Sequence, residues 1–259
     1  MNKISEILNK DNILKPEKML KCQYCGKPYV WFDKDIKFKK IHVQVPDCDC
    51  IEKIERQREQ AALAEQKREK QKQLFENSMM APFFQEKTFS ALKKSEHYDF
   101  CKNYAANFNL NNSKGMRLTG GVGTGKTTLL AAICNDLMKQ GYTCLFTTFS
   151  ELLDKFGTFS YEHAGDITPL LNWLVSFDFV VLDDLGRENY TERRKEIAFR
   201  IIDKLLNYKI ITAFTSNPEM LQRLQKMPEW KAILDRLKDT CPILLQFKGN
   251  SMRGQECLK

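Results

Sequence analysis

Residues Gly120 to Thr127 carry the most distinctive chemical pattern of the chain and read G-G-V-G-T-G-K-T. This stretch fits the pattern G-x-x-x-x-G-K-[ST] in full. Because glycine has no Cβ atom, such a loop can curl until its backbone N–H groups point at phosphate oxygens. Lys126 can then reach the β- and γ-phosphates, and the hydroxyl of Thr127 can bind Mg²⁺. The pattern predicts a nucleotide-binding loop formed by Gly120, Gly121, Val122, Gly123, Thr124, Gly125, Lys126, Thr127 and Thr128.

Two carboxylates further along the chain could complete a magnesium-dependent hydrolytic site. The segment Phe179 to Leu182 is predicted to be a buried strand that ends in Asp183 and Asp184. Since ligands collect at the carboxyl ends of parallel strands, Asp183 can hold Mg²⁺ through water and Asp184 can orient the attacking water. Adjacent carboxylates repel each other, so a nearby cation is needed to keep both ionised. Taken alone, the segment could also be a strand that ends in an acidic turn.

A second buried strand is predicted over Ile210 to Thr215, with Ser216 and Asn217 at its carboxyl end. A polar side chain there can contact the γ-phosphate or the attacking water. By itself, this segment is only a strand that runs into an Asn-Pro turn.

Four cysteines near the start of the chain have the spacing of metal ligands. They are Cys22, Cys25, Cys48 and Cys50, in the segments "CQYCG" and "CDC". Four thiolates around one Zn²⁺ would allow a small module to fold with little hydrophobic core. The second pair is unusually tight, so His42 could replace Cys48 or Cys50. The alternative is a set of free, partly buried thiols.

The composition divides the chain into three predicted parts. Residues 1–50 form the zinc-binding module, and residues 51–77, which contain no Gly or Pro, form a charged linker helix. Residues 78–259 alternate apolar strands with amphipathic helices, a pattern typical of a parallel α/β sheet. A strand before the glycine loop and a helix after it, capped by Gly141, supply the context that the phosphate-binding pattern requires.

Five motifs in this order resemble those of the AAA+ ATPases of the DnaC/DnaI type, which are helicase loaders of bacteria and their phages. The motifs are "GGVGTGKT", "VVLDDLG", "TSN", "ILDRL" and "FKGNSMR", and the resemblance covers residues 80 to 255. It implies an AAA+ P-loop fold, ATP or ADP as ligand, and Mg²⁺. It assigns Lys126 and Thr127 to Walker A, Asp183 and Asp184 to Walker B, Asn217 to sensor 1, and Arg236 to an arginine finger that acts on a neighbouring subunit's ATP. Arg253 falls at a further nucleotide-site arginine of the family.

The chain departs from the usual AAA+ pattern in two places. Asp184 stands where most AAA+ proteins have Glu, and its shorter reach would slow hydrolysis. The chain also ends soon after Arg253, which leaves too few residues for a full helical lid. Both departures lead us to expect slow ATP hydrolysis that a partner or DNA stimulates. Arg236 could alternatively pair with a carboxylate on a helix.

The resemblance implies that the chain binds a replicative hexameric helicase of the DnaB type and places it on single-stranded DNA when replication begins. It also implies self-association through the ATPase domain. Residues 1–50, including an amphipathic start with Ile4 and Ile7, are the candidate helicase-binding surface, or simply the module's own core. Tyr190, Arg193, Arg194 and Lys195 are candidate DNA contacts, although charged residues at a helix start are usually only solvated.

Three alternatives remain at the level of sequence. One is an IstB-type transposition helper ATPase, which shares the ATPase motifs but normally lacks the cysteine cluster. A P-loop kinase would leave "TSN" and "DRL" unexplained, and a non-hydrolysing adaptor would use ATP only as a clamp. The formal net charge of +8 weakly favours an acidic partner such as nucleic acid. The sequence has neither a membrane-length apolar run nor the apolar region of a signal peptide, so we expect a cytoplasmic protein without a membrane partner.

Overall fold

The computed structural model describes residues 20–36, 39–186, 191–249 and 251. The chain divides into two compact units, Met1–Lys67 and Arg68–Lys259. Arg253, Tyr190 and the predicted amphipathic segment at the start of the chain lie outside the described residues.

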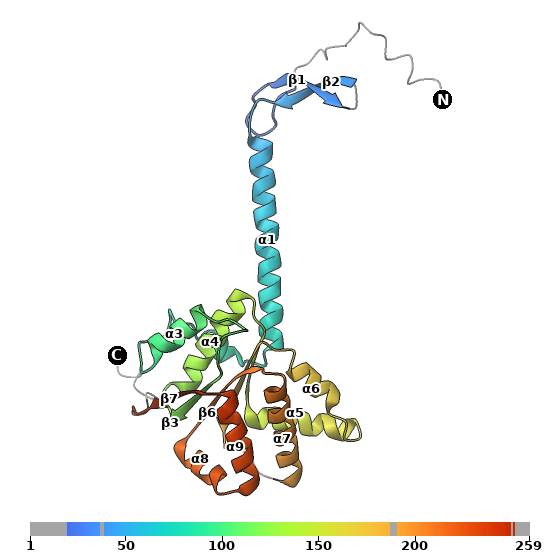
Figure 1. The fold of residues 1–259 in the computed structure, drawn as a ribbon. Coiled ribbons are helices and arrows are strands. Elements are labelled where there is room, and N and C mark those ends of the chain that lie inside the picture. The colour runs from blue at the N-terminus through green and yellow to red at the C-terminus, as the bar shows by residue number, and fades with distance from the viewer. Residues whose placement is uncertain (1–19, 37–38, 187–190, 250, 252–259) are drawn as a thin grey trace. The chain divides into compact units, whose positions relative to one another are not determined.

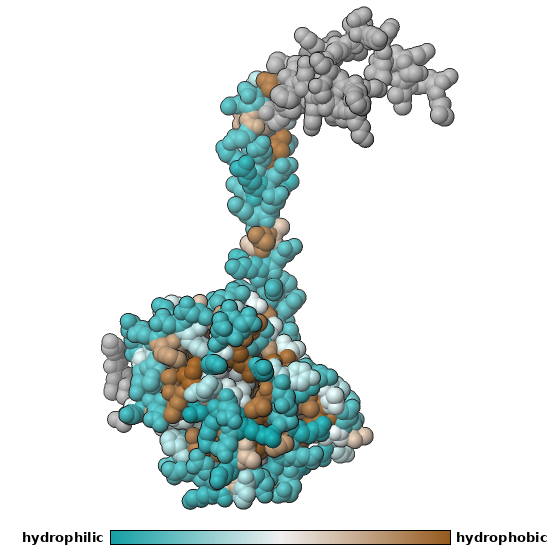
Figure 2. Space-filling view, in the orientation of Figure 1, coloured by the Kyte–Doolittle hydropathy of each residue, from teal (hydrophilic) through white to brown (hydrophobic). Residues whose placement is uncertain are grey.

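The first unit contains an antiparallel hairpin and most of a long helix. Strands β1 (Tyr29–Ile36) and β2 (Lys39–Pro46) pair with Tyr29 opposite Pro46. Helix α1 (Cys50–Asn77) follows, and it continues into the second unit. None of its 28 residues, all of which the structure describes, is buried. Figure 2 accordingly shows hydrophilic side chains over most of its surface. Ion pairs at helical spacing, such as Arg56 with Glu52 at 3.5 Å, support a helix of this composition.

A parallel sheet of five strands forms the centre of the second unit (Figure 1). Its strands are β3 (Met116–Gly120), β4 (Cys144–Thr148), β5 (Phe179–Leu185), β6 (Ile211–Ser216) and β7 (Ile243–Phe247). The strand order is β4-β5-β6-β3-β7, and every pair is parallel. The predicted parallel α/β sheet is therefore confirmed.

Helices cover both faces of this sheet. One hydrophobic cluster gathers residues of α2 (Pro82–Gln85), α3 (Tyr98–Ala106) and α4 (Lys126–Gln140) against one face. The other cluster gathers residues of α5 (Phe149–Glu162), α6 (Thr168–Leu174), α7 (Glu192–Asn207), α8 (Pro218–Gln225) and α9 (Pro228–Thr240). Successive residues of β5 illustrate the division, since Val181 belongs to the first cluster and Val180 and Leu182 to the second. This alternation follows from the period of two along a strand.

The order of the strands determines which loops meet. Strand β6 lies between β3, which leads into the glycine loop, and β5, which carries the two aspartates. Because all five strands run parallel, their carboxyl ends share one edge of the sheet. Gly141 ends α4 with a φ of 97°, which confirms it as the predicted cap.

Among the described residues, we find no helix with the length and apolar character that crossing a membrane requires.

Candidate nucleotide-binding site

The glycine loop joins β3 directly to the start of α4. Gly123 and Gly125 have φ values of 77° and 91°, in the left-handed region that favours glycine. Gly125 is also the residue that precedes the first turn of α4. The first backbone N–H groups of a helix have no partner within the helix, so this end of α4 is suited to bind an anion.

The ammonium group of Lys126 lies inside the curve of the loop. Its Nζ donates to the carbonyl oxygens of Gly120 at 2.9 Å and Gly121 at 2.7 Å, and the residue is only 8% exposed. Thr124 also donates to the Gly121 carbonyl, at 2.9 Å. A buried cation beside the amino end of a helix is the environment that a polyphosphate requires.

The hydroxyl of Thr127 connects the loop to the first of the two aspartates. Thr127 Oγ1 donates to Oδ1 of Asp183 at 3.0 Å, although the two residues lie 56 positions apart in the sequence. Hydroxyl and carboxylate oxygens are the ligands that Mg²⁺ prefers. The structure thus brings together the two residues that the sequence predicts as magnesium ligands, and their donor chemistry fits that ion.

Burial raises the pKa of Asp183, which is 7% exposed, and the neighbouring charge of Asp184 raises it further. Hydrogen bonds from Thr215 and Thr127 and the charge of Lys126 oppose this change in pKa. A divalent cation would favour the ionised form in the same way, because it places positive charge beside the carboxylate.

The two aspartates lie near the carboxyl end of β5, as the sequence predicts. The strand continues to Leu185, and its register against β6 shifts between Leu182 and Leu185. Asp184 sits in this irregularity with a φ of 60° and is half-buried. Its side chain therefore does not follow the simple alternation of the strand, and sequence periodicity did not indicate this.

Thr215 is a site residue that the sequence reasoning missed. Its Oγ1 lies 2.6 Å from Oδ1 of Asp183 and 2.9 Å from the backbone nitrogen of Asp184. All six residues of β6 are buried, and a buried hydroxyl group requires a hydrogen-bond partner. The hydroxyl group of Thr215 in this strand could therefore have indicated a polar partner nearby. Asn217, the predicted sensor, comes directly after this strand and precedes the first turn of α8.

Arg236 has its partners on the surface of α7 and α9 rather than in the glycine loop. It forms an ion pair with Asp203, and its guanidinium lies 4.6 Å from the ring centre of Phe199. The sequence alternative, in which Arg236 pairs with a helix carboxylate, thus describes this contact. Its action on a neighbouring subunit stays a prediction.

The four predicted zinc ligands converge within the first unit. The Sγ atoms of Cys22, Cys25, Cys48 and Cys50 all lie within 4.8 Å of one another, and four thiolates at this separation fit Zn²⁺. Hydrogen bonds from the backbone of Tyr24 and of Cys25 lower the pKa of Cys22 to about 7. The side chain of His42, on β2, lies outside the described part of the chain.

Two of the candidate DNA contacts, Arg193 and Arg194, border a groove between α5 and α7. The groove has a volume of about 430 Å³ and includes Arg193, Arg194 and Tyr161 in its lining. Arg193 donates to Ser160 at 3.1 Å, and Arg194 forms an ion pair with Asp154. Lys195 pairs with Glu192 at 2.7 Å. The structure therefore brings Tyr161 of α5 to the same groove as the basic start of α7.

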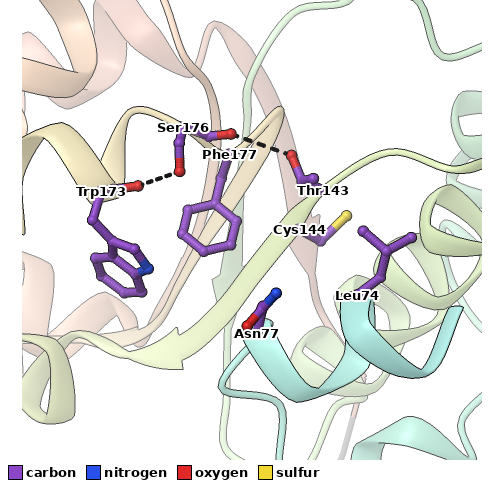
Figure 3. A pocket seen from close by; sticks show the side chains of 7 residues that line it. All are labelled: Leu74, Asn77, Thr143, Cys144, Trp173, Ser176 and Phe177. Carbon is purple, nitrogen blue, oxygen red and sulfur yellow. Dashed lines mark hydrogen bonds between the residues drawn. The ribbon is translucent and has the colours of Figure 1, made fainter. Parts of the chain in front are cut away.

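A second cavity lies away from the glycine loop. It measures about 220 Å³ and is lined by Leu74, Asn77, Thr143, Cys144, Trp173, Ser176 and Phe177 (Figure 3). Thr143 precedes β4 and Phe177 precedes β5, so the cavity lies at the amino ends of these strands. It is therefore at the opposite edge of the sheet from the nucleotide-binding loop.

The family model for IstB-like ATP binding proteins matches residues 52–259. The chain belongs to this family. Among curated relatives of this IstB-like chain, the replicative helicase loader DnaC of Escherichia coli K12 is 27% identical over 137 residues, covering 53% of this chain and 55% of that protein. DnaC of Buchnera aphidicola subsp. Schizaphis graminum is 31% identical over 153 residues, covering 59% and 61%. The chain thus spans little more than half the length of these relatives.

Solved structures show the same fold. The crystal structure of the DnaC helicase loader matches the IstB-like chain with a TM-score of 0.57 at 21% identity, covering 65% of this chain and 100% of that one. A crystal structure of DnaI matches with a TM-score of 0.54 at 24% identity, covering 68% and 95%. The AMPPCP-bound structure of DnaA from Aquifex aeolicus matches with a TM-score of 0.53 at 23% identity, covering 68% and 53%. The predicted resemblance and the AAA+ fold are both confirmed.

Proposed function

We propose that this chain is an ATP-dependent helicase loader that binds a replicative DnaB-type helicase and places it on single-stranded DNA. The observation that carries the proposal is the contact between Thr127 and Asp183 beside the buried Lys126, in a chain whose relatives are named loaders. Those names favour the loader over a transposition helper.

In this proposal, the loop binds the phosphates of ATP and the two aspartates prepare hydrolysis. Lys126 would contact the β- and γ-phosphates, and Thr127 and Asp183 would hold Mg²⁺, which would offset part of their negative charge. Asp184 orients the attacking water, and Asn217 contacts the γ-phosphate or that water. ATP turnover is slow, because the side chain of Asp184 is one methylene shorter than that of the usual Glu. The helicase or DNA stimulates this turnover.

Self-association would bring Arg236 to the ATP of a neighbouring subunit. The side chains of Arg236 and its partner Asp203 are 40% and 37% exposed. An ion pair this exposed contributes only about 0–1 kcal/mol. The guanidinium can therefore exchange the carboxylate for a phosphate at little cost in free energy. Arg253 is proposed as a further nucleotide contact from its place in the motif alone.

The module of residues 1–50 would bind the helicase, with the helix of residues 51–77 joining it to the ATPase domain of residues 78–259. Zn²⁺ held by Cys22, Cys25, Cys48 and Cys50 would stabilise the module. The proximity of the four Sγ atoms supports this assignment.

Single-stranded DNA would bind along the groove between α5 and α7. Tyr161 is 82% exposed and offers a face on which a base can stack, while Arg193 and Arg194 can contact phosphates. Arg194 would exchange Asp154 for a phosphate in the complex.

Co-purification of the full chain with the replicative helicase, with and without ATP, tests the proposal most directly. We expect an ATP-dependent complex that the parent chain forms and Lys126→Ala does not, followed by ATP-dependent transfer of the helicase to single-stranded DNA. If no complex forms under either condition, the loader assignment is wrong. If a complex forms but the parent never hydrolyses ATP with helicase and DNA present, the chain is a non-hydrolysing adaptor.

The DNA surface needs a separate test with a matched charge control. We expect Arg193→Ala/Arg194→Ala to weaken binding of a labelled oligonucleotide at moderate salt. Lys93→Ala/Lys94→Ala removes the same charge from an exposed loop elsewhere and should leave binding almost unchanged. Equal weakening by both pairs would mean that only net charge matters.

A further inference from the structure

We propose that Thr215 is a positioning residue for ATP hydrolysis, because its single hydroxyl group holds both aspartates of the site. Thr215 Oγ1 donates to Oδ1 of Asp183 at 2.6 Å and accepts the backbone N–H of Asp184 at 2.9 Å. The inference rests on the proposed ATPase function and names the residue that orders its hydrolytic groups.

The direction of both hydrogen bonds follows from simple donor counting. A backbone N–H can only donate, so the hydroxyl oxygen of Thr215 must accept from Asp184. A hydroxyl carries one hydrogen, and that hydrogen is then directed to the carboxylate of Asp183. One buried group thereby fixes the side chain of the metal-binding aspartate and the backbone of the next aspartate at the same time.

The irregularity in β5 explains why this hydroxyl is required. Leu182 pairs with Phe214 and Leu185 pairs with Ser216, so β5 contains one more residue than β6 across this interval. A bulge of this kind leaves a residue without its regular ladder partner. Thr215 and Ser216 supply replacements from β6, since Ser216 Oγ donates to the carbonyl of Leu185 at 2.6 Å. The two hydroxyls thus stabilise the bulge on each side of Asp184.

The bulge also places Asp184 in a backbone conformation that is unfavourable for its residue type. A left-handed φ costs an L-residue other than glycine about 1–2 kcal/mol, although aspartate tolerates it better than most. Local hydrogen bonds must offset this cost for the conformation to persist. The bond from Asp184 N–H to Thr215 is one of them.

Thr215 acts through the aspartates and not on the nucleotide. It is 1% exposed, so its hydroxyl has no access to the solvent side of the site. Thr127 is the other hydroxyl donor to Asp183, and its predicted role is to bind Mg²⁺ directly. Thr215 is then the donor that would keep the carboxylate oriented toward the water through which Asp183 holds the metal, as hydrogen-bond partners do for the groups around a metal.

The test replaces the hydroxyl with a methyl group of nearly the same size. Thr215→Val should lower kcat for ATP by about 10–100-fold and raise the Mg²⁺ concentration for half-maximal activity, as expected for loss of a partner behind a metal ligand. Metal-free ADP affinity should change less than about twofold, because the phosphate-binding loop is untouched. Thr215→Ser restores a hydroxyl and should recover most of the activity.

Thr212→Val is the matched control on the same strand. Thr212 is fully buried, and its hydroxyl bonds to the carbonyl of Ile210, away from the aspartates. The inference is wrong if Thr215→Val matches Thr212→Val in kcat and in Mg²⁺ dependence, or if Thr215→Ser is as impaired as Thr215→Val. Should the valine variant fail to fold, Thr215→Ala compared with Thr215→Ser gives the same contrast.

The magnesium readout separates this inference from the proposed function. If the parent chain does not hydrolyse ATP even with helicase and DNA, the proposed ATPase function fails. Magnesium-dependent nucleotide binding then still tests Thr215, since its valine variant should require more Mg²⁺ than the control for half-maximal ATP binding. An unchanged Mg²⁺ requirement in that assay would overturn the inference on its own.

Discussion

Replacement by alanine should destabilise the chain at Gly120 and leave it almost unchanged at Gly121, although the two glycines are adjacent in the loop. A Cβ atom on Gly120 would lie 2.4 Å from the backbone oxygen of Phe247 and 2.7 Å from its Cβ. Gly120 also has a φ of 153°, at the edge of the region that side-chain-bearing residues rarely adopt. A Cβ atom on Gly121 would meet nothing nearer than a methyl group of Thr124 at 3.8 Å, which is an ordinary contact.

The expected magnitude follows from these contacts. The obstacle at Gly120 is the backbone of β7, which pairs with β3 at this position, so relief requires the two strands to separate. Overpacking of this kind costs about 1–3 kcal/mol, and the unfavourable φ adds about 1–2 kcal/mol. For a domain of this size, a loss of about 2–5 kcal/mol lowers the melting temperature by about 4–20 °C. Gly121→Ala should instead change stability by less than about 1 kcal/mol.

Thermal unfolding followed by tryptophan fluorescence measures the difference, since Trp230 is fully buried in the second unit. Titration with a fluorescent ATP analogue shows whether the loop still binds nucleotide. We expect Gly120→Ala to unfold at a lower temperature than the parent and to bind the ATP analogue more weakly. Gly121→Ala should resemble the parent in both assays. Equal melting temperatures for the two variants would refute the argument, because the close approach of β7 would then impose no constraint on the loop.

Four further predictions concern single groups of the site. Lys126→Ala should weaken Mg-ATP binding by about 10–100-fold, measured by calorimetry, because a charged hydrogen bond is worth about 1.5–3 kcal/mol. Asp183→Asn should melt above the parent in EDTA at pH 7, since burial raises the pKa of Asp183. Between the pKa values of Asp183 in the unfolded and in the folded chain, the folded chain binds more protons, so the stability of the parent falls as pH rises. Below about pH 4 the carboxyl group is protonated in both states, and the difference in melting temperature between Asp183→Asn and the parent should shrink. Metal analysis should find one Zn²⁺ per chain and none after Cys25→Ser; an equal zinc content would exclude the cysteine site. Arg236→Ala should reduce ATP turnover only at protein concentrations that permit self-association, with nucleotide affinity unchanged, whereas an equal loss at high dilution would contradict action between subunits.

Local patterns were enough to predict the binding loop and the type of each neighbouring element. The glycines, Lys126 and Thr127 are contiguous, and the strand and helix beside them show their own periods of two and 3.6. The cysteine spacing likewise predicted that four thiols converge, and their Sγ atoms lie within 4.8 Å of one another. These features depend on residues that are near one another in the chain, so the sequence alone carries them.

Local patterns did not predict the register shift in β5. The apolar run Phe179–Leu182 and the two aspartates after it correctly indicated a strand, which continues to Leu185, but they did not indicate the shift in register against β6. A bulge depends on the partner strand as much as on the strand itself. The hydroxyl groups of β6 that stabilise it could not be recognised from β5.

The sequence by itself therefore determined that a loop with the phosphate-binding pattern, an acidic strand end and a paired set of cysteines are present. Only the tertiary structure decided which groups meet: Thr215 with the two aspartates, Arg236 with Asp203, and the start of α7 with the exposed ring on α5. The physical reason is the strand order. Long-range packing of apolar faces places β6 between β3 and β5, and no periodicity within a single segment records which strand will become its neighbour.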